Sequence, residues 1–193
     1  MGYVHGYGAP ERKFAGPEGG AGPALQLQDG QVIEGYASLF GKRDQGGDVV
    51  MRGAYAGSLA RLKASGRRVR MLWQHDPMQP IGIWEEVRED ATGLWVKGRI
   101  LTEVEKGREA AALVAAGAMD GLSIGYRTLR ADRDAKGGRQ LAELELWEVS
   151  LVTFPMLPEA RVSAKSETGQ DTWRRLAQVI DHARLTGPGR SSA

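Results

Sequence analysis

Strand-like runs separated by turn residues dominate the middle of this chain and limit the folds open to it. Residues 81–89 and 94–101 are two such runs, and the four residues between them read Asp-Ala-Thr-Gly, a typical hairpin signal. Residues 122–130 and 140–154 form a second pair, joined by the turn-rich segment 132–138. Residues 32–40 and 69–73 are further strand candidates. Because most of these strands follow one another as hairpins, we expect an antiparallel sheet or barrel.

Helical patterns occur in three places. Residues 54–63 carry apolar side chains at helical spacing, and Gly66 follows as an end signal. Residues 102–105 read Thr-Glu-Val-Glu, the spacing of a capping box, and the alanine-rich run to residue 116 completes a second helix. After a polar linker, residues 171–185 show one apolar face, made by residues 173, 176, 177 and 180, that calls for a partner surface or for docking on its own domain. The chain is therefore expected to be an α+β protein.

Length and composition indicate one globular domain with tails. Residues 1–30 hold many of the 27 glycines and are expected to be mostly flexible, residues 31–165 form the domain, and residues 166–193 hold the linker and the last helix. The 26 basic and 24 acidic residues are interspersed, so neither nucleic acid nor membrane is an expected partner. Cysteine is absent and the three histidines are scattered, so we expect no disulfide, metal or cofactor. With no leader pattern and no long apolar run, a soluble, cytosolic protein is expected.

Three polar residues in these strands have the chemistry of acyl transfer. Ser123 lies between glycines in the motif GLSIG, His75 ends the run MLWQH at a Pro-limited corner, and Glu148 interrupts an apolar strand. A serine, an imidazole and an orienting acid can act as nucleophile and base. Each residue also has an ordinary explanation: a small residue at a tight contact, a turn cap and a solvent-facing carboxylate. Spacing alone does not show that the three meet.

The GLSIG motif also matches the nucleophile elbow G-x-S-x-G of α/β hydrolases. An elbow needs a helix directly after the serine, and the acid and histidine further along the chain. Here the residues after Ser123 read as strand, and the downstream histidine, His182, lies in the predicted tail helix. We therefore reject the elbow interpretation.

An ordered string of motifs gives the chain a family resemblance between residues 32 and 165. The string consists of EGYASLF at 34–40, GDVV at 47–50 with GAY at 53–55, LWQHDP at 72–77 with PIG at 80–82, GLSIGY at 121–126 and LWEVSLVTFP at 146–155. In this order and spacing, the motifs resemble the prohead (capsid maturation) proteases of tailed bacteriophages, distant relatives of the herpesvirus assemblin proteases. The chain departs from the family pattern at 156–158, where it reads Met-Leu-Pro.

The resemblance implies a mostly antiparallel, closed β-barrel surrounded by a few helices, and a serine peptidase. Carried over by position, Ser123 is the nucleophile, His75 the general base and Glu148 the orienting acid. Asp76, beside the histidine, stays open as an alternative acid. Arg161 and the backbone near Gly121 are the candidates for an oxyanion hole.

The implied function is a serine endopeptidase that trims the N-terminal scaffolding segment of the major capsid protein. It would act inside immature proheads in the host bacterial cytoplasm, with the capsid protein as substrate and the portal as a further candidate partner; self-association stays open. The alternative is a catalytically inactive capsid assembly or scaffolding protein with the same barrel. A third interpretation, an oligonucleotide-binding barrel, depends on the basic run RRVR at 67–70 with Trp73, which is more typical of a solvated charge run.

Overall fold

Eight strands and two helices make up the part of the chain that the computed structural model describes, residues 26–28, 31–134, 137–157 and 159–160. In chain order they are β1 (Gln26–Gln28), β2 (Val32–Leu39), β3 (Val49–Val50), α1 (Ala56–Ala64), β4 (Arg70–Trp73), β5 (Asp76–Glu89), β6 (Gly93–Ile100), α2 (Glu105–Ala115), β7 (Gly121–Arg133) and β8 (Arg139–Val152). All strands join one sheet in the order β1-β2-β6-β5-β4-β8-β3, and β7 pairs with β8. The pairs are antiparallel except β3–β8 and β4–β8. The predicted α+β class is therefore confirmed.

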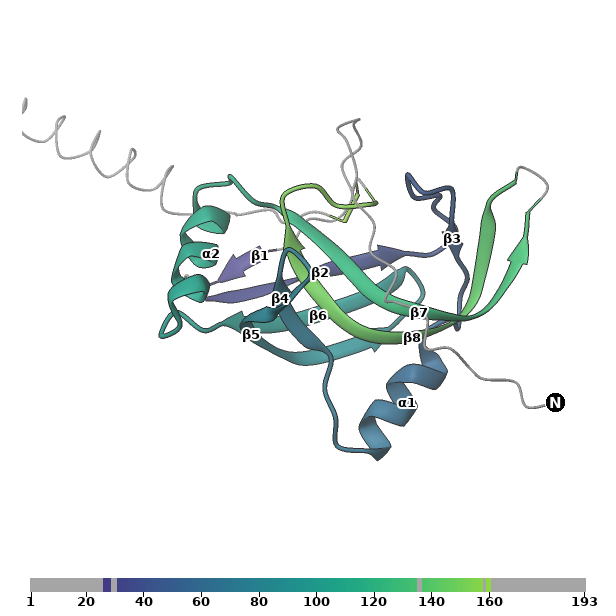
Figure 1. Ribbon diagram of the computed structural model, residues 1–193, viewed down its shortest axis with the longest axis horizontal. Helices are drawn as coiled ribbons and strands as arrows, with labels where there is room; N and C mark the ends of the chain where they lie inside the picture. Colours follow the sequence, from purple (N-terminus) through teal and green to yellow (C-terminus); the bar gives the residue numbers. More distant parts are fainter. Residues whose placement is uncertain (1–25, 29–30, 135–136, 158, 161–193) are drawn as a thin grey trace, which may run out of the picture.

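The sheet curls strongly into a half-barrel (Figure 1), and the prediction of a closed barrel is wrong. Among the described residues, β1 pairs with β2 alone and β7 with β8 alone, so no ladder of hydrogen bonds joins the two ends of the sheet. The curl is strongest along the two longest neighbouring strands, β7 and β8, whose pairing contains three register shifts. Such bulges bend a strand and increase its local twist.

Residues that follow β8 cover the edge of β7 that does not pair with β8, close to β2. The backbone N–H of Leu122 in β7 donates to the carbonyl of Ala160 at 2.9 Å. Leu157 and Ala160 are buried and pack with Leu39 of β2. This cover satisfies a backbone donor at the edge and removes apolar surface from water, so the edge is protected without a closing strand pair.

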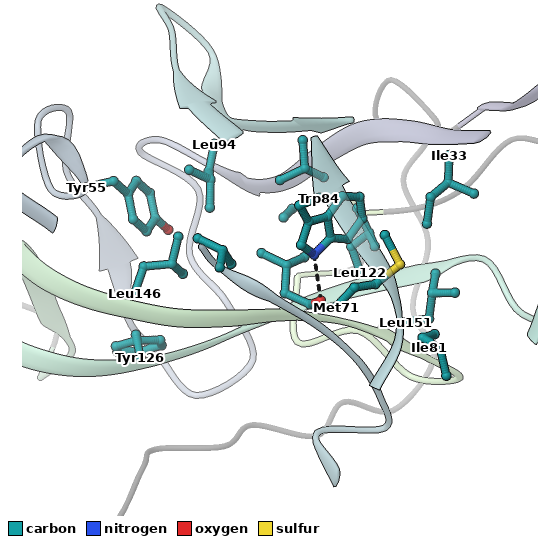
Figure 2. Packing of buried hydrophobic residues seen from close by; sticks show 14 of the residues in the cluster. Ile33, Tyr55, Met71, Ile81, Trp84, Leu94, Leu122, Tyr126, Leu146 and Leu151 are labelled. Carbon is teal, nitrogen blue, oxygen red and sulfur yellow. Dashed lines mark hydrogen bonds between the residues drawn. The ribbon is translucent and has the colours of Figure 1, made fainter. Parts of the chain in front are cut away.

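The main core fills the inside of the curl, where side chains from distant strands meet (Figure 2). Trp84 of β5 lies at its centre, and its indole N–H donates to the carbonyl of Val149 in β8 at 3.1 Å. Leu94 of β6 and Leu151 of β8 are fully buried in the same cluster. Burial of each such aliphatic side chain contributes roughly 1.5–3 kcal/mol. The face of β8 that points into the core is thus held by packing. Its opposite face carries the polar residues described below.

Both helices in the described part of the chain lie where the sequence predicted them. Gly66 follows α1 with a φ of 64°, as expected for a helix end. The predicted capping box is wrong, because the N-cap of α2 is Val104, which makes no side-chain capping bond. The hydroxyl of Thr102 instead accepts a hydrogen bond from the side-chain amide of Gln31 at 2.9 Å. Thr102 therefore bonds a residue distant in the sequence and does not cap the helix.

Several predictions concern residues outside the described part of the chain: most of the flexible segment 1–30, the helix 171–185 and Arg161. The domain limits 31–165 stay a prediction. Of the helices described, neither is long and apolar enough to span a membrane. The described residues also contain no group of three or more His, Asp or Glu side chains arranged to hold a metal ion.

Candidate active site

His75 lies at the tip of a two-residue turn between β4 and β5. Trp73 and Asp76 pair across this turn, and Gln74 and His75 have φ angles of 50° and 61°. Positive φ at both central residues is the geometry of a type I′ turn, which Asn-Gly sequences normally supply. For other residues the left-handed region costs about 1–2 kcal/mol each. The surrounding structure therefore has to hold this turn in place.

Strand β8 supplies the bonds that hold the turn. The backbone N–H of Gln74 donates to the carbonyl of Leu151 at 2.9 Å, and its side-chain amide donates to the hydroxyl of Thr153 at 2.6 Å. The backbone N–H of His75 donates to Ser150 Oγ at 3.2 Å. Since β4 runs parallel to β8 up to the turn, these bonds continue the pairing of the two strands. They offset the strain that the sequence of the turn introduces.

Glu148 faces the turn because a bulge in β8 changes which side chains point into the core. The register between β7 and β8 shifts at Trp147, which is the extra residue. Alternation along a strand moves by one position at a bulge. Leu146 points into the core before the bulge and Val149 does so after it. Glu148 and Ser150 are left together on the opposite face.

The imidazole of His75 and the carboxylate of Glu148 form a buried pair. Nδ1 of His75 lies 2.5 Å from Oε1 of Glu148, and the two residues are 2% and 8% exposed. Ser150 Oγ donates to the second carboxylate oxygen, Oε2, at 2.6 Å. In the tautomer that carries its proton on Nδ1, the ring donates to the carboxylate and has Nε2 as its proton acceptor. This arrangement can fix the tautomer of a general base and stabilise its protonated form.

Asp76, the alternative acid, accepts hydrogen bonds from two residues close to it in the chain, at the start of β5. Oδ1 accepts the backbone N–H of Met78 at 2.9 Å, and Oδ2 accepts the side-chain amide of Gln79 at 2.8 Å. These contacts organise the first residues of β5, where the strand leaves the turn. The geometry thus favours Glu148 as the partner of the imidazole.

Ser123 lies beside this pair on the neighbouring strand, β7. Its partner across the ladder is Ser150, and residues paired in this way share a face with Cβ atoms about 5 Å apart. Gly125, two residues along the same face, is paired with Glu148. A Cβ on Gly125 would lie only 2.7 Å from Glu148 Cδ, so a glycine is needed for the carboxylate to lie across β7. Strand pairing therefore places Ser123 opposite Ser150, whose hydroxyl is bonded to both His75 and Glu148.

The surroundings of Ser123 are tightly packed. Ser123 is 4% exposed and borders a cavity of about 30 Å³ between β2 and β7, roughly the room of one water molecule. Gly121, at the start of β7, is buried, and a Cβ there would lie 2.6 Å from the carbonyl oxygen of Val152. The N–H of Leu122 is engaged by Ala160. Among the candidate oxyanion donors, the amide of Leu122 is therefore already occupied, and Arg161 lies outside the described residues.

Comparison with known proteins shows to which family this chain belongs. Residues 23–175, well over half of the chain, match the sequence model of the caudovirus prohead serine proteases. The chain belongs to the prohead serine protease family. The resemblance inferred from the motif string is thereby confirmed.

Two known proteins are similar to this chain, one in sequence and one in fold. The prohead protease of Enterobacteria phage HK97 is 32% identical over 147 residues, which cover 74% of this chain and 64% of the relative's own length. The solved structure of the capsid assembly protease of bacteriophage T4 matches with a TM-score of 0.52 and 15% identity, over 63% of this chain and 81% of that one. At this identity the structural match concerns the fold alone, so the half-barrel is similar to that of a capsid protease.

Two residues at the candidate site were missed in the sequence, Ser150 and Gly125. The available signal was the period of two along a strand. Ser150 is two residues from Glu148, and Gly125 is two residues from Ser123, so each shares a face with a predicted site residue. The left-handed turn at Gln74 and His75 had no such signal, because neither residue favours positive φ.

Proposed function

We propose that this chain is a serine endopeptidase that cleaves the N-terminal scaffolding segment of the major capsid protein during maturation of a phage or phage-like prohead. Family membership and the relative named prohead protease support the biological setting. The observation that carries the serine mechanism is the buried contact between His75 and Glu148 beside Ser123. The enzyme would act inside the immature prohead, in the cytoplasm of the host bacterium.

In the first proposed step, Ser123 Oγ attacks the carbonyl carbon of the scissile peptide bond. Its proton passes to Nε2 of His75, while the carbonyl π pair moves onto the oxygen to give a tetrahedral oxyanion. Glu148 keeps Nδ1–H oriented and stabilises the imidazolium that forms. The 2.5 Å contact between Nδ1 and Oε1 supports this assignment of the acid.

Collapse of the tetrahedral species completes acylation. The C–N bond breaks, and Nε2 of His75 returns the proton to the leaving amine, which leaves an acyl group on Ser123. A water molecule, deprotonated by the same imidazole, then attacks the acyl carbon. The bond between this carbon and Ser123 Oγ breaks, the imidazolium returns its proton to Oγ, and the acid product leaves. Arg161 and the backbone near Gly121 are the proposed oxyanion donors.

The experiment that tests this function is co-expression with the major capsid protein of the same phage, followed by mass spectrometry of the capsid N-termini. Wild type is expected to yield trimmed capsid protein, and Ser123→Ala untrimmed protein. Ser58→Ala is the matched control, because Ser58 is also buried and its hydroxyl accepts the N–H of Leu146. Trimming by a folded Ser123→Ala protein would exclude the serine mechanism. A wild-type chain that binds the capsid protein without trimming it would favour the inactive assembly protein.

A further inference from the structure

Ser150 connects the base and the acid of the site through a single hydroxyl. Its Oγ donates to Glu148 Oε2 at 2.6 Å and accepts the backbone N–H of His75 at 3.2 Å. The residue is fully buried, with 0% of its surface exposed. Both directions of hydrogen bonding that a hydroxyl offers are therefore used within the site.

We propose that Ser150 is a positioning residue that sets the carboxylate of Glu148 and the backbone of His75 relative to Ser123, an inference that rests on the proposed serine mechanism. Ser150 itself touches no reacting atom in this mechanism. It acts through the other two residues, and it lies opposite Ser123 in the β7–β8 ladder.

The carboxylate needs this hydroxyl because its two oxygens have different tasks. Oε1 contacts the imidazole, and Oε2 is fixed by Ser150 at the opposite side. A buried carboxylate that loses one of its donors becomes poorly solvated and rotates towards other donors. Rotation of Glu148 would lengthen its contact with Nδ1 and release the imidazole from its orientation.

The turn needs the same hydroxyl because His75 has a left-handed backbone, with a φ of 61°. The bond from its N–H to Ser150 Oγ is one of the contacts that hold this conformation. Without it, the imidazole would shift relative to the nucleophile. Misplacement of a catalytic group by about 1 Å costs on the order of 100-fold in rate.

The test measures the rate at which a fluorophosphonate probe labels Ser123. In this reaction Oγ forms a bond to phosphorus, fluoride leaves, and the proton goes to His75. Ser150→Ala is expected to label about 10- to 100-fold more slowly than wild type, with recovery in Ser150→Thr or Ser150→Cys, which keep a donor. Ser58→Ala, which removes another buried hydroxyl bonded to β8, is expected to label at the wild-type rate.

A double variant separates positioning from a general loss of packing. Since Ser150 acts through Glu148, Ser150→Ala should slow the labelling of Glu148→Gln far less than it slows that of wild type. Wild-type labelling by Ser150→Ala would overturn the proposal. So would an equal slowing in Ser58→Ala, or additive losses in the double variant.

A spectroscopic readout keeps this inference separate from the proposed function. In the Ser123→Ala protein, the Nδ1 proton of His75 should give a far-downfield NMR resonance from its bond to Glu148. We expect Ser150→Ala to move or broaden that resonance, and Ser58→Ala to leave it in place. An unchanged resonance overturns the positioning role even if Ser123 is the nucleophile, whereas capsid trimming by Ser123→Ala defeats the proposed function alone.

Discussion

The position of His75 is determined by the backbone as much as by its side-chain partners. A residue with negative φ at this point of the turn would direct its side chain elsewhere, and the imidazole would not reach Glu148. The left-handed conformation is strained for histidine, and the strain is offset by bonds to β8. Strand β8, which carries Glu148, thus also holds His75 in place.

The site residues should behave as one unit when they are replaced. We predict that His75→Ala/Ser123→Ala is scarcely less active than either single variant, because each single loss already removes proton transfer to and from the nucleophile. Each single variant should lose roughly 10³-fold or more in the rate of capsid trimming. Glu148→Gln should be milder than His75→Ala, since it changes the orientation of the base and leaves the base in place.

Asp76→Asn is the control for this series, and trimming rates of the co-expressed capsid protein are the measurement. The Asp76 carboxylate accepts hydrogen bonds from Met78 and Gln79 at the start of β5. Near-wild-type trimming is therefore expected of Asp76→Asn. Full activity in Glu148→Gln together with its loss in Asp76→Asn would show that the acid is Asp76.

Gly125 gives a second test at the same scale, because it leaves room for the Glu148 carboxylate. A methyl group at this position would overlap the Glu148 carboxylate. We predict that Gly125→Ala lowers the rate of fluorophosphonate labelling about 10- to 100-fold, because the carboxylate must move away from the imidazole. Gly57→Ala is the control, since its nearest contact is the flexible end of Arg61. A labelling rate equal to wild type in Gly125→Ala would mean that the carboxylate position is unimportant.

At the scale of single elements, one carboxylate, that of Asp90, organises the hairpin of β5 and β6. Asp90 Oδ1 accepts the N–H groups of Thr92 at 2.7 Å and Gly93 at 3.1 Å. Its Oδ2 accepts the hydroxyl of Tyr36 and the guanidinium of Arg88, both at 2.8 Å. Partial burial opposes ionisation of Asp90, but the bonds from Thr92, Tyr36, Gly93 and Arg88 outweigh it and hold its pKa below the ordinary value of 3.8.

The lowered pKa of Asp90 determines the direction in which the stability of the folded protein changes with pH. Because the pKa is lower in the folded than in the unfolded chain, the stabilisation is complete above about pH 3.8 and is lost as the pH falls through the folded-state pKa. We predict that Asp90→Asn destabilises the protein by roughly 1–2 kcal/mol near neutral pH, and that the difference from wild type narrows below about pH 4. Thermal melts at several pH values measure this effect. Asp132→Asn, at an exposed position, is the control, and a difference between wild type and Asp90→Asn that widens at low pH would contradict the prediction.

The elements themselves were largely predictable, and the irregular links between them were not. Alternating runs and turn residues predicted the positions of β2, the β5–β6 hairpin and the β7–β8 pair, because local sequence decides these features. The predicted start of β5 at residue 81 is too late, since the strand begins at Asp76 and contains Pro77 and Pro80. These prolines fit because the pairing of β5 with β4 shifts register there. The bulge at Trp147, which turns Glu148 and Ser150 to the site, depends on tertiary pairing that one sequence does not display.

At the scale of the whole molecule, the residues that follow β8 protect the edge of the sheet. The closed barrel was expected from the family resemblance, whereas the half-barrel uses Leu157 and Ala160 as a cover between β2 and β7. We predict that Leu157→Ala destabilises the protein by about 2–4 kcal/mol and speeds hydrogen exchange of the Leu122 amide, which bonds Ala160. Leu113→Ala, at a partly exposed position of α2, should do neither. If the hydrogen-exchange rate of the Leu122 amide is the same in Leu157→Ala as in wild type, packing of Leu157 does not protect the edge of β7.

The central claim is that Ser123 is a nucleophile activated by His75 and Glu148, and mapping a covalent adduct tests it most directly. The purified chain is treated with the fluorophosphonate probe, digested and sequenced by tandem mass spectrometry. One adduct is expected, on Ser123, with labelling lost in His75→Ala and retained in Ser58→Ala. An adduct on another serine, or undiminished labelling of Ser123 in a folded His75→Ala protein, would contradict the claim.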